Sequence, residues 1–142
     1  MGQIQARRGR SIESGMKPRV LVVDDEPAIV ATVCAILEAY GFSPVGVTSG
    51  EEAIAKATDS CPDVLLCDVM MPGLNGFETG LQVKKVCPTC RLLFFTGYAE
   101  VPGLADDLKS NGHAFEVLGK PVRPAELVDK INAALAAGGQ AL

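Results

Sequence analysis

Five short apolar runs recur along the chain, and four of them end in a polar or charged residue. Each run has the length of a β-strand, and the segments between them place apolar residues at the 3,4 spacing of amphipathic helices. Strands are predicted over residues 19–24, 44–48, 63–68, 91–96 and 114–118. Helices are predicted over residues 26–40, 50–59, 77–86, 104–110 and 124–137.

Local signals mark several helix ends. Pro27 and Pro124 each open a helix, since proline is favoured in a first turn. Ser49 is a predicted N-cap, with Glu52 completing a capping box. Pro72-Gly73 and Asn75-Gly76 are read as turn signals after the third strand. The inward faces of the helices are predicted to carry Val30, Val33, Leu37, Tyr40, Ala53, Ile54, Ala57, Leu127, Ile131 and Leu135.

Five strand-then-helix units predict a parallel sheet, because parallel neighbours need crossover connections and right-handed crossovers place helices on both faces. The expected fold class is α/β, a doubly wound five-stranded parallel sheet. Since no glycine-rich nucleotide fingerprint is present, the flavodoxin-like strand order 2-1-3-4-5 is favoured over the dinucleotide-binding order.

This strand order would gather five polar side chains at the carboxyl ends of the strands, where open α/β sheets bind ligands. They are Asp24, Asp25, Asp68, Thr96 and Lys120. Three carboxylates at one place repel each other unless a cation holds them. Ligation by oxygen alone, without His or Cys, suits Mg²⁺, or Mn²⁺ in its place.

The same set of residues suits phosphoryl transfer. The Thr96 hydroxyl and the Lys120 ammonium could balance the charge on a transferring phosphoryl group. Asp68 is then left as the nucleophile that forms an acyl phosphate. Asp24 or Asp25 alone would more often be a helix cap, but a cap explains neither three acids nor the lysine.

Composition limits the alternatives. The chain has 142 residues, of which 48% are hydrophobic, enough for one domain. No window approaches the ~18 apolar residues of a membrane span, and no signal peptide is recognisable, so a cytoplasmic protein without membrane insertion is expected. Four of the first 18 residues are basic, whereas the remainder is acidic and has no basic stripe, which argues against direct nucleic-acid binding. Residues 1–17 are predicted to be a disordered basic tail and 139–142 a short C-terminal tail.

The five cysteines are an odd number without framework spacing, so reduced thiols and no disulfide are expected. Cys87 and Cys90 have the spacing of a redox or metal pair, but no second pair accompanies them, and ordinary thiols are favoured. His113, the only histidine, is expected to be structural.

At these residues the sequence resembles the receiver domain of response regulators in two-component phosphorelays, over about residues 18–138. The matching features are Asp24-Asp25, Asp68 followed by Met71-Pro72-Gly73 and Gly76, Thr96, and Lys120-Pro121. The resemblance implies that a phosphohistidine on a histidine kinase or phosphotransfer protein phosphorylates Asp68. It implies Mg²⁺ ligation by Asp25, Asp68 and the Met70 carbonyl, with Asp24 acting largely through water.

In this family Thr96 would be the switch hydroxyl, Lys120 its counter-charge, and Lys120-Pro121 a cis bond. Phosphorylation would change a binding surface around the helix 104–110, the strand 114–118 and the final helix, for a downstream target or a second copy. The chain would undergo self-phosphorylation and self-dephosphorylation only, without being an enzyme otherwise. Whether it stands alone or belongs to a larger regulator or hybrid kinase stays open.

Two departures from the family pattern affect these expectations. Val117 occupies the position where receivers usually carry Tyr or Phe, and Phe115 lies one step away on the same strand face. Met70 and Tyr98 flank the expected path of water attack but offer neither a carboxylate nor an amide. Slow self-dephosphorylation is therefore expected.

A second class of function is a Mg²⁺-dependent phosphohydrolase of the haloacid-dehalogenase type, which shares aspartyl-phosphate chemistry. That family resembles this sequence in a Thr and a Lys. It places its nucleophile after the first strand and a second Asp two residues later, where this sequence has Glu26. Turnover of a phosphomonoester would separate the two classes.

Overall fold

The computed structural model describes residues 16–97 and 116–137. Within them five parallel strands form one sheet in the order β2-β1-β3-β4-β5, which confirms the predicted topology. The strands are β1 (Arg19–Val23), β2 (Ser43–Val47), β3 (Val64–Asp68), β4 (Arg91–Thr96) and β5 (Glu116–Gly119). Their bounds agree with the predicted runs to within one or two residues.

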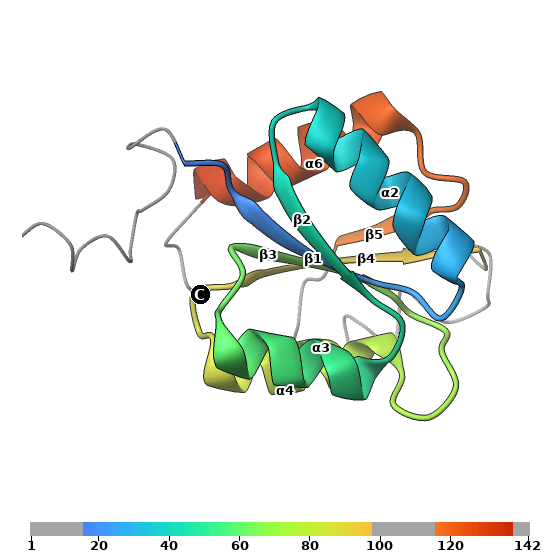
Figure 1. Ribbon diagram of the computed structural model, residues 1–142, viewed down its shortest axis with the longest axis vertical. Coiled ribbons are helices and arrows are strands. Elements are labelled where there is room, and N and C mark those ends of the chain that lie inside the picture. The colour runs from blue at the N-terminus through green and yellow to red at the C-terminus, as the bar shows by residue number, and fades with distance from the viewer. Residues whose placement is uncertain (1–15, 98–115, 138–142) are drawn as a thin grey trace, which may run out of the picture.

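Helices cover both faces of the sheet (Figure 1). On one face lie α2 (Pro27–Ala39) and α6 (Pro124–Ala137), and on the other lie α3 (Gly50–Asp59) and α4 (Gly76–Val86). The central strand β3 is buried along its whole length, because it has strands on both sides and helices on both faces. This is the doubly wound α/β architecture expected from the alternation of the sequence.

Alternation along the strands divides the core into two clusters. The cluster under α2 and α6 takes Val22, Leu66, Phe95 and Leu118, whereas the cluster under α3 and α4 takes Cys67 and Phe94. Neighbouring residues of one strand therefore point to opposite faces. This division decides which side chains can meet above the carboxyl ends of the strands.

The predicted helix faces are mostly confirmed, with one exception. Val30, Val33 and Leu37 are buried on α2, but Tyr40 is 53% exposed. Tyr40 is the C-cap of α2, and the chain turns away at Gly41, whose φ is +92°. Because Tyr40 lies beyond the last helical turn, the spacing that placed it on the inner face no longer holds.

Two helix N-termini differ from the prediction. Ser49 caps α3 by accepting a hydrogen bond from the Glu52 N–H, but the Glu52 carboxylate accepts from the Thr48 N–H and so forms no capping box. The reciprocal pair exists instead at α4, between Asn75 and Glu78. Asn75-Gly76 is thus a helix start rather than only a turn.

A disulfide joins Cys61 to Cys87, so the expectation of reduced thiols without a disulfide is wrong for this pair. Cys61 follows α3 and Cys87 is the C-cap of α4, and the packing of these helices brings their Cα atoms to 5.6 Å. Cys90, three residues after Cys87, is a free buried cysteine, as expected for an ordinary thiol. The spacing of Cys61 and Cys87 in the sequence could not predict this disulfide, because it depends on how the two helices pack.

Several predictions lie outside the described residues. They concern the basic N-terminal tail up to residue 15, Tyr98, the helix 104–110, His113, Phe115 and the C-terminal tail. Among the described helices, none has the length and apolar character that crossing a membrane requires.

Candidate functional site

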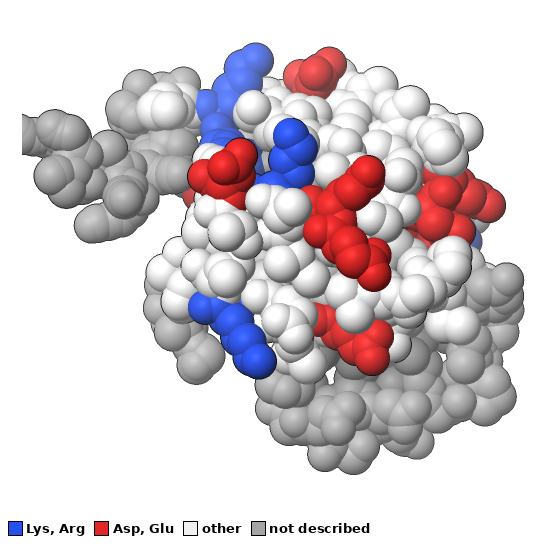
Figure 2. Space-filling model, turned by 60° about the horizontal axis from the view of Figure 1, so that its bottom comes forward, with Lys and Arg blue, Asp and Glu red and all other residues white. Residues whose placement is uncertain are grey.

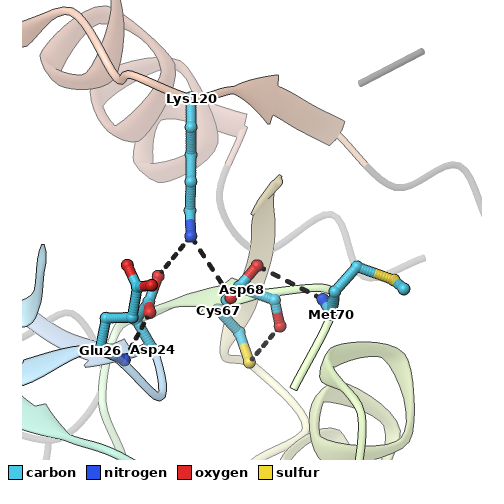
Figure 3. A network of polar contacts seen from close by, with 6 residues as sticks. All are labelled: Asp24, Glu26, Cys67, Asp68, Met70 and Lys120. Atoms are coloured by element: carbon cyan, nitrogen blue, oxygen red, sulfur yellow. Dashed lines mark hydrogen bonds and ion pairs between the residues drawn. The ribbon is translucent and has the colours of Figure 1, made fainter. Parts of the chain in front are cut away.

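The carboxyl ends of β1, β3 and β5 bring Asp24, Asp68 and Lys120 into direct contact. Lys120 Nζ lies 2.7 Å from Oδ2 of Asp24 and 3.3 Å from Oδ2 of Asp68. Figure 3 shows the lysine side chain extended from the end of β5 toward both carboxylates. One ammonium therefore contacts two carboxylates that come from different strands and compensates part of their combined charge.

Asp24 is fully buried directly after β1. Its Oδ1 accepts a hydrogen bond of 2.8 Å from the Glu26 N–H, while Oδ2 faces Lys120. The backbone of Glu26 is thus part of the site, a role that its residue type does not signal in the sequence. The chain turns into α2 here, and this turn aims the Glu26 N–H at the carboxylate.

Asp68 is the last residue of β3 and only 3% exposed. Its Oδ1 accepts a hydrogen bond from the Met70 N–H, and its Oδ2 faces Lys120. Burial, and next the nearby charge of Asp24, raise the pKa of Asp68 to about 6, although Lys120 and the Met70 N–H oppose the shift. The carboxylate is consequently held in an environment where its negative charge is only partly compensated.

Burial lowers the pKa of Lys120, but the hydrogen bond to Asp24 and the charges of Asp68 and Asp24 outweigh it, and the pKa is raised overall. The lysine therefore carries its positive charge at neutral pH. Its Nζ also lies 5.0 Å from the centre of the Phe95 ring. Phe95 was not predicted as a neighbour of the site, because its sequence position is that of an ordinary core residue of β4.

Asp25 joins the other two acids from an exposed position. Carboxylate oxygens of Asp24, Asp25 and Asp68 all lie within 4.8 Å of one another. Three oxygen donors at this spacing, one of them open to solvent, suit a hard divalent cation that keeps part of its water shell. The residues therefore fit the Mg²⁺ expected from the sequence, and Mn²⁺ as a substitute.

Thr96 ends β4 beside these residues and is buried. Its carbonyl accepts a hydrogen bond of 2.9 Å from the Lys120 N–H, which ties the end of β4 to the segment after β5. The bond between Lys120 and Pro121 is cis, as the resemblance predicted. By strand alternation the Thr96 side chain points to the face opposite Phe95.

Two glycines shape the loop after Asp68. A Cβ on Gly76 would lie 2.1 Å from the Asp68 carbonyl oxygen, so the start of α4 packs directly on the backbone of the site. Gly73 has a φ of +74°, which suits glycine. Both glycines therefore constrain the loop, and Met70, which comes before them, leaves its side chain 51% exposed.

The position of Val117 is also settled. Val117 pairs with Phe94 in the sheet and packs, partly buried, against the core under α3 and α4. Phe94 in turn makes an edge-to-face contact with Phe77 of α4, with ring centres 5.0 Å apart. Two aromatic rings thus lie on the face toward which the usual aromatic residue at position 117 would point.

The helices of one face carry their charges in a consistent direction. Acidic residues occupy the first turns of α3 and α4, while Lys56, Lys84 and Lys85 lie in the last turns. In Figure 2, which brings this face forward, Asp and Glu gather mostly toward the right and Lys and Arg toward the left. The acidic ends complement the helix dipoles on the side of the carboxylate cluster.

Comparison with protein families gives one family over most of the chain. Residues 20–132 match the family described as the response regulator receiver domain. The protein PilH of Pseudomonas aeruginosa is 33% identical over 118 residues, which are 83% of this chain and 98% of PilH. The DNA-binding response regulator MtrA of Mycolicibacterium smegmatis is 29% identical over 84% of this chain, and the chain spans about half of its length, 51%.

Solved structures agree with this result. A CheY-like receiver domain protein from Methanospirillum hungatei superposes with a TM-score of 0.75 at 28% identity, covering 84% of this chain and 94% of that one. The chemotaxis protein CheY4 of Vibrio cholerae gives a TM-score of 0.74 at 29% identity, covering 83% of this chain and 98% of CheY4.

Proposed function

Because the chain belongs to the response regulator receiver domain family, we propose that it accepts a phosphoryl group on Asp68 and transmits a signal through a changed binding surface. The observation that carries the proposal is the contact of the Lys120 ammonium with two buried carboxylates, Asp24 and Asp68. Such a lysine can also neutralise an anion that arrives at Asp68.

The proposed reaction transfers phosphoryl from a phosphohistidine of a partner protein. An Asp68 carboxylate oxygen attacks phosphorus, an O–P bond forms, and the P–N bond to the imidazole breaks. The imidazole nitrogen leaves with the electron pair and takes a proton from water. Lys120 stays beside the product, where it faces the negative charge of the new phosphoryl oxygens. Water later hydrolyses the acyl phosphate, so the chain undergoes phosphorylation and dephosphorylation without other turnover.

Mg²⁺ is the proposed cofactor, with Mn²⁺ as a possible substitute. Asp24, Asp25, Asp68 and the Met70 carbonyl are the proposed ligands, with Asp24 acting mainly through water. When bound, the ion would supply charge neutralisation for the carboxylates and the phosphoryl oxygens. The support for this assignment is the grouping of three carboxylates within 4.8 Å and the absence of nitrogen or sulfur donors among them.

Thr96 is the proposed switch residue, with its hydroxyl turning to the phosphoryl group. The affected surface would include β5 and α6 together with the predicted helix 104–110. The tie between the Lys120 N–H and the Thr96 carbonyl supports this route, because a shift at the end of β4 acts directly on the segment after β5. Since Val117, which pairs with Phe94 in the sheet, replaces the usual aromatic residue, the proposed change does not use a rotating ring at position 117.

Receiver domains act with histidine kinases and downstream effectors in two-component systems. For this chain we propose a histidine kinase or histidine phosphotransfer protein as donor, and a downstream protein or a second copy as target. Direct contact of the folded domain with nucleic acid is not part of the proposal. The proposed extent of the domain is residues 18–138, between the tails 1–17 and 139–142, and the proposed location is the cytoplasm.

The haloacid-dehalogenase alternative is not favoured. The family match covers residues 20–132, and the acid two residues after Asp24, Glu26, contributes only its N–H to the described contacts around Asp24. In addition, the candidate nucleophile lies at the end of β3 rather than β1.

The deciding experiment is incubation of the purified chain with acetyl phosphate and Mg²⁺, followed by intact-mass measurement and peptide mapping. We expect one equivalent of phosphoryl, located on Asp68, absent with EDTA and absent in Asp68→Asn. Asp63→Asn is a matched control, because Asp63 lies at the opposite end of β3. Release of many equivalents of phosphate from a phosphomonoester would instead indicate a phosphohydrolase, and no incorporation at Asp68 would refute the proposal.

A further inference from the structure

The Lys120 side chain has to cross a strand to reach its partners. Lys120 follows β5, whereas Asp68 ends β3 and Asp24 follows β1, and β4 lies between β5 and β3. Figure 3 shows the lysine side chain extended from the end of β5 toward Asp68 and Asp24. Its position therefore depends on the side chain that β4 presents beneath it.

That side chain is Phe95. It is fully buried and belongs to the core under α2 and α6, together with Leu66 and Leu118. In the sheet register Phe95 pairs with Asp68 on one side and with Leu118 on the other. The next residue of β4, Thr96, points to the other face by alternation. Phe95 is thus the residue of β4 that lies on the path of the lysine.

The contact itself is of the cation–π kind. Lys120 Nζ lies 5.0 Å from the centre of the Phe95 ring, within the range over which the ring face attracts a cation. The ring is held rigidly by the core, while a free lysine side chain has many rotamers. An aliphatic residue at this position would fill space but would offer no negative ring face to the ammonium.

We propose that Phe95 is a positioning residue for phosphoryl transfer, whose ring holds the Lys120 ammonium above β4 so that it faces Asp68 and the incoming phosphoryl group. This inference rests on the proposed function and adds one positioning residue, Phe95, to the proposed site. In this role the ring acts on phosphoryl transfer through the lysine.

The chain offers a matched control in the adjacent residue. Phe94 is equally buried, but it points to the other face of the sheet and contacts Phe77. Phe95→Leu and Phe94→Leu therefore remove the same group from the same strand. With acetyl phosphate and saturating Mg²⁺, we expect Phe95→Leu to lower the phosphorylation rate constant roughly tenfold. Phe94→Leu should stay within about twofold of the unaltered chain, and both variants should lose similar thermal stability. Phe95→Met replaces Phe95→Leu if the latter does not fold.

A purely structural role of Phe95 predicts a different result, which a double-mutant cycle with Lys120→Met detects without any activity measurement. If the ring holds the lysine, the shifts of the urea midpoint caused by Phe95→Leu and Lys120→Met will not add, whereas those of Phe94→Leu and Lys120→Met will. Additive shifts at Phe95 would overturn the inference. Equal phosphorylation rates for the two leucine variants would overturn it as well. Failure of the unaltered chain to become phosphorylated would instead refute the proposed function, and the cycle would still report the contact.

Discussion

The ammonium of Lys120 lies 2.7 Å from Oδ2 of Asp24, a carboxylate with no exposed surface. A buried charge that loses its partner is costly, because neither water nor another group replaces it. This relation makes Lys120 a structural as well as a chemical element of the site. The buried partner also distinguishes Lys120 from the surface lysines of the chain, whose ion pairs are weakened by solvent screening.

We therefore expect Lys120→Met to lower the free energy of unfolding by about 3 kcal/mol in metal-free buffer. Mg²⁺ should restore more stability to this variant than it adds to the unaltered chain, because the acids then lack their own counter-charge. Urea unfolding with and without MgCl₂ measures both effects. Lys130→Met is the control: its pair with Glu116 is just as short, at 2.6 Å, but exposed, and no comparable loss is expected. Equal losses in the two variants would contradict the prediction.

Asp68 should make stability depend on pH. Burial and the charge of Asp24 raise its pKa to about 6 in the folded chain, whereas an unfolded Asp titrates at about 3.9. The folded state therefore binds the proton more tightly, and its stability falls as pH rises from about 4 to about 6. Asp68→Asn removes this cost.

The variant should accordingly be more stable than the unaltered chain above pH 6, by about 2–3 kcal/mol. The difference should shrink as pH falls through the folded pKa and vanish toward about pH 3, below both pKa values, where the carboxyl group is protonated in both states. Urea titrations in EDTA across this range test the prediction. A stability difference that does not vary with pH would show that Asp68 is not the group responsible.

Gly76 sets how closely α4 approaches the site. An alanine Cβ would lie 2.1 Å from the Asp68 carbonyl oxygen, a backbone atom that cannot rotate away. We expect Gly76→Ala to cost about 3 kcal/mol of stability as the helix is pushed off the strand end. Gly97→Ala is the matched control, since its Cβ would meet nothing nearer than Lys120 Cδ at 3.8 Å. Thermal unfolding that ranks the two variants equally would contradict this explanation.

Much of this fold could be predicted because its signals are local. Apolar strands alternating with amphipathic helices fix the parallel sheet, and the ends of parallel strands fix where their terminal residues meet. For this reason Asp24, Asp68 and Lys120 were predicted to lie together, and the contacts confirm it. Their proximity follows from the strand order and from the position of each residue at the end of a strand.

What could not be predicted depends on contacts between segments far apart in the sequence. The disulfide of Cys61 and Cys87 follows from the packing of α3 on α4, and the contact of Phe95 with Lys120 follows from the route of one side chain across β4. Neither contact can be recognised from the spacing of residues along the sequence. Asn75 was a different case, since an Asn followed three residues later by Glu is a recognisable helix start that the neighbouring Gly76 concealed.

The disulfide should contribute measurably to stability. It closes a loop of 26 residues between two helices of the same face, and restricting the unfolded chain in this way is worth about 3 kcal/mol. Reduction should therefore lower Tm by roughly 10 °C. Cys61→Ser should give the same lower Tm with and without reductant. Cys34→Ser, which alters a free cysteine, should keep the dependence on reductant. Identical Tm values of the oxidised and reduced chain would refute the prediction.

Met70 is expected to control how long the phosphorylated state lasts. Its N–H is bound to Asp68, while its side chain is 51% exposed and offers no group that could orient water toward phosphorus. If Asp68 is phosphorylated as proposed, Met70→Asn should speed the loss of phosphoryl on the order of tenfold, because an amide beside the phosphorus can position the attacking water. Met70→Leu, which keeps an apolar side chain, should leave the rate slow. The decay of the phosphorylated mass after removal of acetyl phosphate measures both variants. Rapid decay in the unaltered chain, unchanged by asparagine, would show that the exposed methionine does not limit water attack.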